Sequence, residues 1–200
     1  MSKTFKIMTI SFLFFCGISQ NCEAYDNDNT HKYLNLRALE ESKADSILKD
    51  SLGISEGINK KVGGKEIWKC IRDGGREEDE PNWRCLRHFH DPLKESKNWN
   101  DAGLSSSYRS SIYWAQTPEA GNSYGLYNVY SWRLANDYYY QALTTGSEEY
   151  YAITFRALGQ LMHLVSDAAV PAHVRNDPHP FVQPYEKRFM VAPEHTYRFH

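Results

Sequence analysis

The feature that most constrains this chain is a long helical pattern that ends in a cluster of polar residues. Residues 147–170 read SEEYYAITFRALGQLMHLVSDAAV, and Ser147 before two glutamates is typical of the start of a helix. Apolar residues then recur at helical spacing on one face, namely Phe155, Leu158, Leu161, Met162 and Val165. Because Pro171 cannot continue a helix, the pattern predicts a helix that closes just before it.

The end of this helix carries three candidate metal ligands in the motif HLVSDAAVPAH, residues 163–173. His163 and Asp167 are four residues apart, so a helix projects them from the same side. The break at Pro171 lets His173 turn back toward them. Imidazole and carboxylate groups suit zinc. Taken alone, however, the same triple also fits a polar helix face with a chance histidine at its end.

The rest of the chain predicts further helices and no convincing strands. Residues 30–53 carry a broken apolar stripe with Thr30 as candidate N-cap, and residues 64–72 suit a second helix. Gly74, Gly75 and Pro81 predict a loop after it. A short helix is expected before Pro118, and residues 129–146 form a clearer one that ends at Gly146. The fold class predicted is all-α, in a single multi-helix domain.

The first 24 residues are expected to be a signal peptide. Lys3 and Lys6 precede a short apolar run, and Cys22 and Ala24 occupy the −3 and −1 positions of a cleavage signal. The run is short for a membrane span, which needs roughly 20 apolar residues. The mature domain would comprise residues 25–200 and work in a secreted or periplasmic location.

Charge and cysteine content narrow the partners and the chemistry. The formal net charge of −2 excludes a broad basic face for duplex nucleic acid. After cleavage, Cys70 and Cys85 remain, and an oxidising compartment makes a disulfide between them plausible, with two unlinked thiols as the alternative. No zinc-finger cysteine spacing, phosphate-binding glycine loop, Gly-x-Ser-x-Gly or His-Glu-x-x-His motif is present.

Three motifs in order resemble the secreted zinc-dependent phospholipase C family, which shares its all-helical fold with single-strand-specific zinc nucleases. HLVSDAAVPAH is similar to the family's His-x3-Asp-x5-His element. EDEPNWRCLRHFHDP resembles its acidic residue followed by a His-Phe-aromatic-Asp-Pro segment. THKYLN lies close behind the expected cleavage site, as in the family. The resemblance covers most of residues 25–187.

The resemblance implies a centre of two or three zinc ions. His31 would bind one ion together with the free amine and carbonyl of Tyr25, which signal-peptide cleavage creates. Asp79 and His88 would bind another with His163 and Asp167, and Asp167 would bridge two ions. The full set implied is Tyr25, His31, Asp79, His88, His163, Asp167, His173, His179 and Glu186.

The chain departs from the family at the third zinc. His173 would open this site, but Val182 stands where the family has a histidine, so His179 or His195 would have to substitute. Glu186 lies where the family carboxylate falls. The chain is also shorter than typical relatives, which suggests a C-terminal truncation. Nearby, His90 is read as a loop histidine that can exchange roles with His88, and Glu78 as a solvated charge.

The function implied is a secreted zinc-dependent phosphodiesterase that hydrolyses phospholipid headgroup phosphodiesters with a metal-activated water. Asp79 would orient or deprotonate that water. The partners expected are a phospholipid or a membrane surface, and no protein partner is implied. A nuclease on the same metal centre is the first alternative, since aromatic side chains can stack the bases of a single strand. A metal-stabilised binding domain without turnover is the second.

Overall fold

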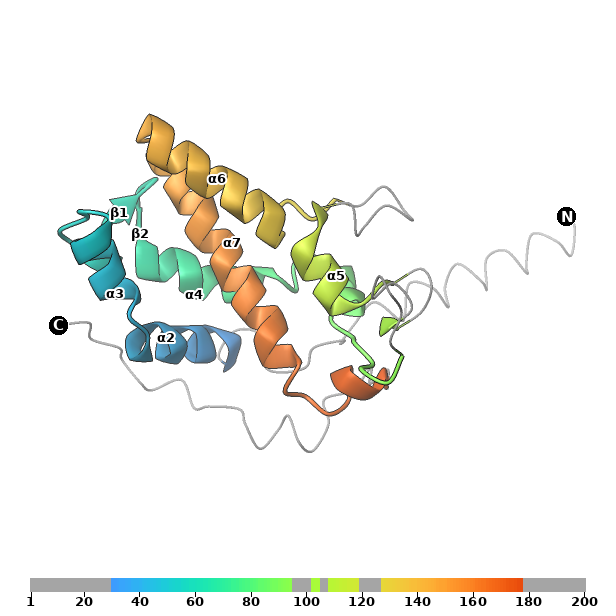
Figure 1. Ribbon diagram of the computed structural model, residues 1–200. Coiled ribbons are helices and arrows are strands. Elements are labelled where there is room, and N and C mark those ends of the chain that lie inside the picture. The colour runs from blue at the N-terminus through green and yellow to red at the C-terminus, as the bar shows by residue number, and fades with distance from the viewer. Residues whose placement is uncertain (1–29, 95–101, 105–107, 119–126, 178–200) are drawn as a thin grey trace, which may run out of the picture.

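The computed structural model describes residues 30–94, 102–104, 108–118 and 127–177, and these are mostly helical (Figure 1). The all-α expectation is confirmed at this level, since the described strands are two residues each and pair antiparallel. In chain order the elements are α2 (Lys32–Glu41), α3 (Ala44–Ser46), η2 (Ile47–Ser51), η3 (Gly57–Asn59), β1 (Lys61–Val62), β2 (Lys65–Glu66), α4 (Ile67–Glu77), η4 (Asn82–Arg87), α5 (Ser111–Gln116), α6 (Trp132–Thr145), α7 (Glu148–Asp167) and η7 (His173–Arg175).

Helix α7 is the centre of the arrangement and packs most extensively against α4 and α6, while α2 packs against α4 (Figure 1). An apolar cluster lies where α4, the first half of α7 and the α2–η3 region meet. Its buried members are Leu39, Leu48, Ile58, Val62, Ile67, Cys70, Ile71 and Phe155. Burial of this apolar surface is the main stabilising contribution to the fold.

Two glycines let the backbones of α4 and α7 come into contact. A Cβ on Gly159 would lie 2.1 Å from the Ile71 carbonyl oxygen, and a Cβ on Gly74 would lie 2.2 Å from the Arg156 carbonyl oxygen. No side chain larger than hydrogen fits at either position without a shift. The Asn35 side chain of α2 then donates hydrogen bonds to the carbonyls of Ile71 and Gly159, both at 3.0 Å, and joins the three helices.

This close crossing corrects the expected end of the second helix. The sequence predicts a helix over 64–72 and a loop at Gly74 and Gly75, whereas α4 begins at Ile67 and continues to Glu77. Gly74 lies at the crossing with α7 and Gly75 lies against Asn35 of α2, and a sequence pattern does not distinguish these roles from that of a turn.

The other helix boundaries follow the sequence more closely. The broken stripe of residues 30–53 is a broken helix that forms α2, α3 and η2, although the N-cap of α2 is His31 and not Thr30. Helix α6 ends at Gly146, whose φ of 69° is left-handed as expected of a C-cap glycine. Helix α7 has Ser147 as N-cap and ends at Asp167. On its predicted apolar face Phe155 is buried, but Val165 is 74% exposed.

No disulfide joins Cys70 and Cys85, the pair for which the sequence makes one plausible, and both side chains are buried. Cys70 is part of the apolar cluster between α4 and α7, and burial raises the pKa of its thiol. Cys85 lies in η4. The alternative of two unlinked thiols is therefore the one that the structure shows.

Among the helices in the described part of the chain, none combines the length and the hydropathy needed to cross a membrane. The expected signal peptide, residues 1–24, lies outside the described residues.

Candidate metal centre

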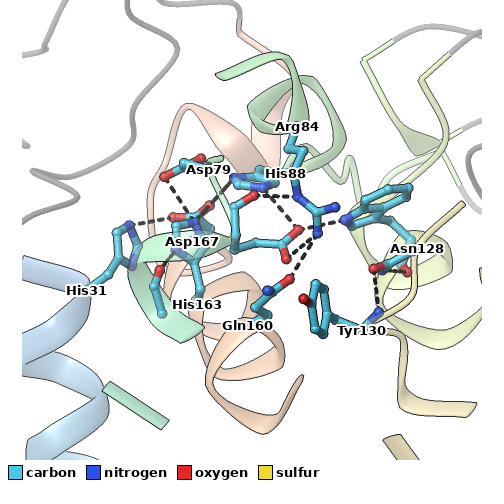
Figure 2. Close-up of polar contacts among 12 residues, drawn as sticks. His31, Asp79, Arg84, His88, Asn128, Tyr130, Gln160, His163 and Asp167 are labelled. Atoms are coloured by element: carbon cyan, nitrogen blue, oxygen red, sulfur yellow. Dashed lines mark hydrogen bonds and ion pairs between the residues drawn. The ribbon is translucent and has the colours of Figure 1, made fainter. Parts of the chain in front are cut away.

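Six residues from five segments of the chain meet at the C-terminal half of α7, and Figure 2 labels five of them. His31 precedes α2, Asp79 follows α4, His88 follows η4, His163 and Asp167 lie on α7, and His173 begins η7. We call His31, Asp79, His88, His163, Asp167 and His173 the His/Asp cluster. Each member is at most 2% exposed. Ionisable side chains are rarely buried to this extent unless they are paired or bind a metal.

Asp167 lies at the middle of the cluster and approaches all four histidines. Its Oδ2 is 2.8 Å from Nδ1 of His88 and 3.1 Å from Nε2 of His163. The same oxygen is 3.5 Å from Nδ1 of His173. Its Oδ1 is 3.5 Å from Nε2 of His31. One carboxylate with both oxygens facing imidazole nitrogens is suited to bridging two cations.

Asp79 is the second carboxylate of the cluster. Its Oδ1 is 3.3 Å from Nδ1 of His88, and its Oδ2 is 3.5 Å from Nε2 of His163. His88 and His163 therefore each face both carboxylates, and their own ring nitrogens Nδ1 and Nε2 are 3.3 Å apart. Asp79 comes within reach because it follows α4 directly, just beyond the close crossing with α7.

The tautomer of His163 follows from its partner on α4. Its Nδ1 is 2.6 Å from the Gly75 carbonyl oxygen, which can only accept, so Nδ1 carries the proton. Gly75 is in the last turn of α4, where carbonyls have no partner within the helix. In the neutral ring Nε2 then presents a lone pair toward Asp79 and Asp167. Metal-binding histidines are commonly oriented through their second nitrogen in this way.

His31 is oriented by an equivalent contact through a serine. Ser166 Oγ donates its proton to the His163 carbonyl oxygen at 2.7 Å. The same Oγ is 3.0 Å from Nδ1 of His31, so it accepts a hydrogen bond from that nitrogen. Nε2 of His31 is thus the lone-pair nitrogen that faces Asp167. Ser166 lies inside the motif HLVSDAAVPAH, but nothing in the motif marks it as the partner of His31.

In the cluster, lone-pair nitrogens of histidine rings face carboxylate oxygens. Positive charge between them is needed to offset their repulsion. Among the described residues, no hydrogen bond of good geometry reaches either oxygen of Asp79 or of Asp167. Buried carboxylates without such partners are strongly destabilising unless a proton or a metal ion neutralises them. The residues present therefore fit a metal site.

The pKa shifts show how protons would substitute for that charge. Burial lowers the pKa of His31, and the neighbouring His163 lowers it further, so His31 stays neutral. Burial opposes protonation of His88 and His163 too, but nearby Asp79 and Asp167 outweigh it and raise both pKa values. Burial also raises the pKa of Asp79. For Asp167 the surrounding histidines outweigh burial and hold the pKa well below its usual range.

Two sets of three ligands can be drawn from the cluster. One is His31, Asp79 and His163, and the other is His88, His163 and Asp167; within each set the ligand atoms lie within 4.8 Å of one another. The donors are imidazole nitrogens and carboxylate oxygens, which zinc accepts, although other divalent metals do as well.

The structure thus brings together six of the nine residues expected as ligands. His173 joins them through its contact with Asp167. Tyr25, His179 and Glu186 lie outside the described residues. His90 does not enter the cluster: its Nδ1 is 2.9 Å from Ser110 Oγ, and its backbone N–H donates to the His173 carbonyl. It helps to anchor η7 beside the segment that carries His88.

A buried network that the sequence analysis missed lies next to the cluster (Figure 2). Glu78, expected to be a solvated charge, is 1% exposed. Arg84 donates to its Oε2 at 2.6 Å and to its backbone carbonyl at 2.8 Å, and Trp114 Nε1 donates to its Oε1 at 2.7 Å. Arg84 also donates to Gln160 of α7 at 3.1 Å. Nothing in a run of four acidic residues indicates which of them is buried.

Comparison with known proteins gives no match, since neither a family model, nor a curated protein, nor a solved structure resembles the chain significantly.

Proposed function

We propose that the chain is a secreted zinc-dependent phosphodiesterase of the phospholipase C type, with two or three zinc ions held by the His/Asp cluster. The observation that carries the proposal is the pair of buried carboxylates, Asp79 and Asp167, that face four histidines without hydrogen-bonded partners among the described residues. The resemblance of the three sequence motifs supports the same reading, because those motifs supply all six residues of the cluster.

The two carboxylates suit different tasks. Asp167 approaches all four histidines and would bridge two ions. Asp79 approaches two of the four, His88 and His163, and the resemblance implies that it orients or deprotonates the attacking water. Zinc ions bound here would supply the positive charge that stabilises a phosphodiester under attack and acidifies water. Asp79 is the residue we assign to take the proton from the attacking water.

The complete burial of the cluster favours a second candidate function. Structural zinc sites are closed, whereas catalytic sites keep a position for water or substrate. With every member at most 2% exposed, the cluster also fits a domain that zinc stabilises without turnover.

The deciding experiment measures zinc content and turnover on the chain that begins at Tyr25. A chromogenic choline phosphodiester, a dispersed short-chain phospholipid and a single-stranded oligonucleotide would serve as substrates. Phosphodiesterase activity on the first two that disappears in Asp79→Asn, even at zinc concentrations that saturate this variant, is the result expected. Asp73→Asn, which alters a carboxylate paired with Lys65 and Arg72 outside the cluster, is the matched control.

Other outcomes would redirect the assignment. Cleavage of the oligonucleotide alone would point to a nuclease. Bound zinc without turnover on any of the three substrates would identify the stabilised, non-catalytic domain. A chain that binds no zinc would contradict both.

A further inference from the structure

We infer that Glu78 is a positioning residue of the metal centre, which orients the His88 ring so that Nδ1, and not Nε2, is the ligand atom. The inference rests on the proposed metal centre and deepens it. Nothing in the motifs distinguishes Glu78 from the other acids of residues 77–80, and it follows from the geometry of the described residues alone.

The His88 ring lies between two acidic groups on opposite sides. Its Nδ1 faces the cluster, 2.8 Å from Asp167 Oδ2 and 3.3 Å from Asp79 Oδ1. Its Nε2 faces away, 3.6 Å from Glu78 Oε1. A neutral imidazole has one N–H and one lone pair. Nδ1 faces the two carboxylates that need a cation between them, so a metal ion there would take the Nδ1 lone pair and leave the N–H on Nε2, toward Glu78.

Glu78 is held too firmly to be a ligand itself. Its Oε2 accepts from Arg84, and its Oε1 accepts from Trp114 Nε1. The Arg84 guanidinium lies 2.6 Å from Oε2 and pairs with the carboxylate in its anionic form. Asp79, the next residue, shows the opposite pattern, with neither oxygen hydrogen-bonded. Of these two neighbouring carboxylates, Glu78 therefore supports the His88 ring, and Asp79 is the one available to bind a metal ion.

Residues of η4, α5 and α7 form the network that fixes the direction of the Glu78 carboxylate. Arg84 lies over the Trp114 ring of α5, with 4.9 Å from guanidinium carbon to ring centroid. It also reaches Gln160, one turn before His163 on α7. A buried ion pair of this kind contributes little net stability against apolar residues of the same volume. Its position beside His88 gives it a role in orienting the ligand, as carboxylates do behind metal-bound histidines.

The first test needs no substitution. In the zinc-loaded chain, long-range ¹H–¹⁵N NMR of the histidine rings reports which nitrogen binds the metal and which carries the proton. The expected pattern for His88 is zinc on Nδ1 and a proton on Nε2. Zinc on Nε2 of His88 would overturn the inference and leave the metal centre intact, whereas a chain without any bound zinc would overturn both.

Two variants then measure the contribution of Glu78. Glu78→Ala is expected to weaken zinc affinity about 10- to 100-fold, the usual range for losing such a supporting group. Glu78→Gln keeps the shape and one acceptor oxygen, so a loss of less than about tenfold is expected. Glu80→Gln, whose carboxylate is 49% exposed and pairs with Arg76, is the matched control and should leave affinity unchanged.

These readouts separate positioning from a merely structural role. If Glu78 only stabilised the fold, both variants would lower the melting temperature while the zinc affinity of the folded protein and the His88 ring pattern stayed as in the parent. That result would contradict the inference. Mixed or reversed His88 protonation in Glu78→Gln, with the other histidine rings unchanged, would support it.

Discussion

The same two helices, α4 and α7, build two regions that are stabilised in opposite ways. In the first half of α7, Phe155 packs with Ile67 and Ile71 into the apolar cluster, whose buried members are all hydrophobic. In the second half, the lone-pair nitrogen Nε2 of His163 lies beside the carboxylate oxygens of Asp79 and Asp167, so that hydrogen-bond acceptors face one another. The first region needs only burial. The second needs protons or a metal ion, and the backbone crossing at Gly74 and Gly159 separates them.

This difference means that fold stability and metal affinity should respond to separate substitutions. The apolar cluster should determine the stability of the zinc-free chain, whereas the His/Asp cluster should determine what zinc adds. Each of the following predictions tests or breaks that separation.

Truncating the apolar cluster should have the largest effect. Phe155→Ala removes a side chain that is 9% exposed and is expected to lower the free energy of unfolding by about 3–5 kcal/mol. Chemical denaturation with and without zinc measures it. The loss should be equal in both conditions, and zinc affinity at temperatures where the variant is folded should be unchanged. A selective loss of zinc binding would break the proposed separation.

Removing the central carboxylate should act almost entirely on metal binding. Asp167→Asn keeps the shape of the side chain but deletes the charge that faces four histidines. We expect zinc affinity to fall by at least about 100-fold, more than about 2.7 kcal/mol, by competition titration with a chelator. Asp177→Asn, a carboxylate that is 51% exposed beside Arg175, is the control. Equal losses in the two variants would refute the role of Asp167.

A substitution at the crossing should affect both regions together. Gly159→Ala places a methyl group 2.1 Å from the Ile71 carbonyl oxygen, so the helices must separate. Overpacking costs about 1–3 kcal/mol, of which the higher helix propensity of alanine returns up to about 1 kcal/mol. Zinc affinity should fall as well, because Gly75 on α4 moves away from His163.

A glycine with a positive φ outside the crossing provides the comparison for Gly159→Ala. Gly53→Ala meets no atom within 4 Å, but its φ of 67° is unfavourable for alanine. It should lower the melting temperature and leave zinc affinity unchanged. If Gly159→Ala gives the same pattern as Gly53→Ala, the crossing does not control the metal centre.

The smallest effect is a pH dependence of opposite sign in the stability of the zinc-free chain and in the stability gained from zinc. Asp79 and Asp167 outweigh burial and raise the folded-state pKa values of His88 and His163, so these groups stabilise the zinc-free chain at lower pH. That stability is lost as pH rises through those values. His31, whose pKa burial lowers, opposes this only below about pH 6.5.

Zinc must displace the same protons, so its affinity should fall about tenfold, or about 1.4 kcal/mol, for each proton released between about pH 8 and 7. Thermal melts across this range should show the gain from zinc narrowing on acidification, while the zinc-free chain becomes more stable. A gain from zinc that does not change with pH would show that the histidines are not the ligands.

The sequence predicts the His/Asp cluster better than it predicts the α4–α7 crossing that positions the cluster. Gly146 marks where α6 ends because it acts locally on the backbone, whereas α7 ends at Asp167, four residues before the Pro171 that the sequence offers as its stop. His163 and Asp167 share a face by helical spacing alone. For the α4 glycines the sequence predicts a loop, because their role depends on contacts with distant parts of the chain. The contact between His163 and the Gly75 carbonyl likewise joins residues that are more than 80 positions apart.

The acidic run shows the same limit at the level of single residues. Asp79 was chosen among four acids only through a resemblance, and Glu78 was read as solvated. Their burial is decided by the partners Arg84, Trp114 and Gln160, which come from three elements. Composition and spacing carry no information on which acid these partners meet.

The contact between His31 and Ser166 spans 135 residues, from the first described helix to the end of α7. During synthesis, His31 leaves the ribosome long before any of its partners on α7 has been made. His163 and Asp167 are made equally late, so metal binding at the proposed centre would have to wait until α7 is complete. A chain interrupted before α7 would lack both of these residues and also Phe155 of the apolar cluster.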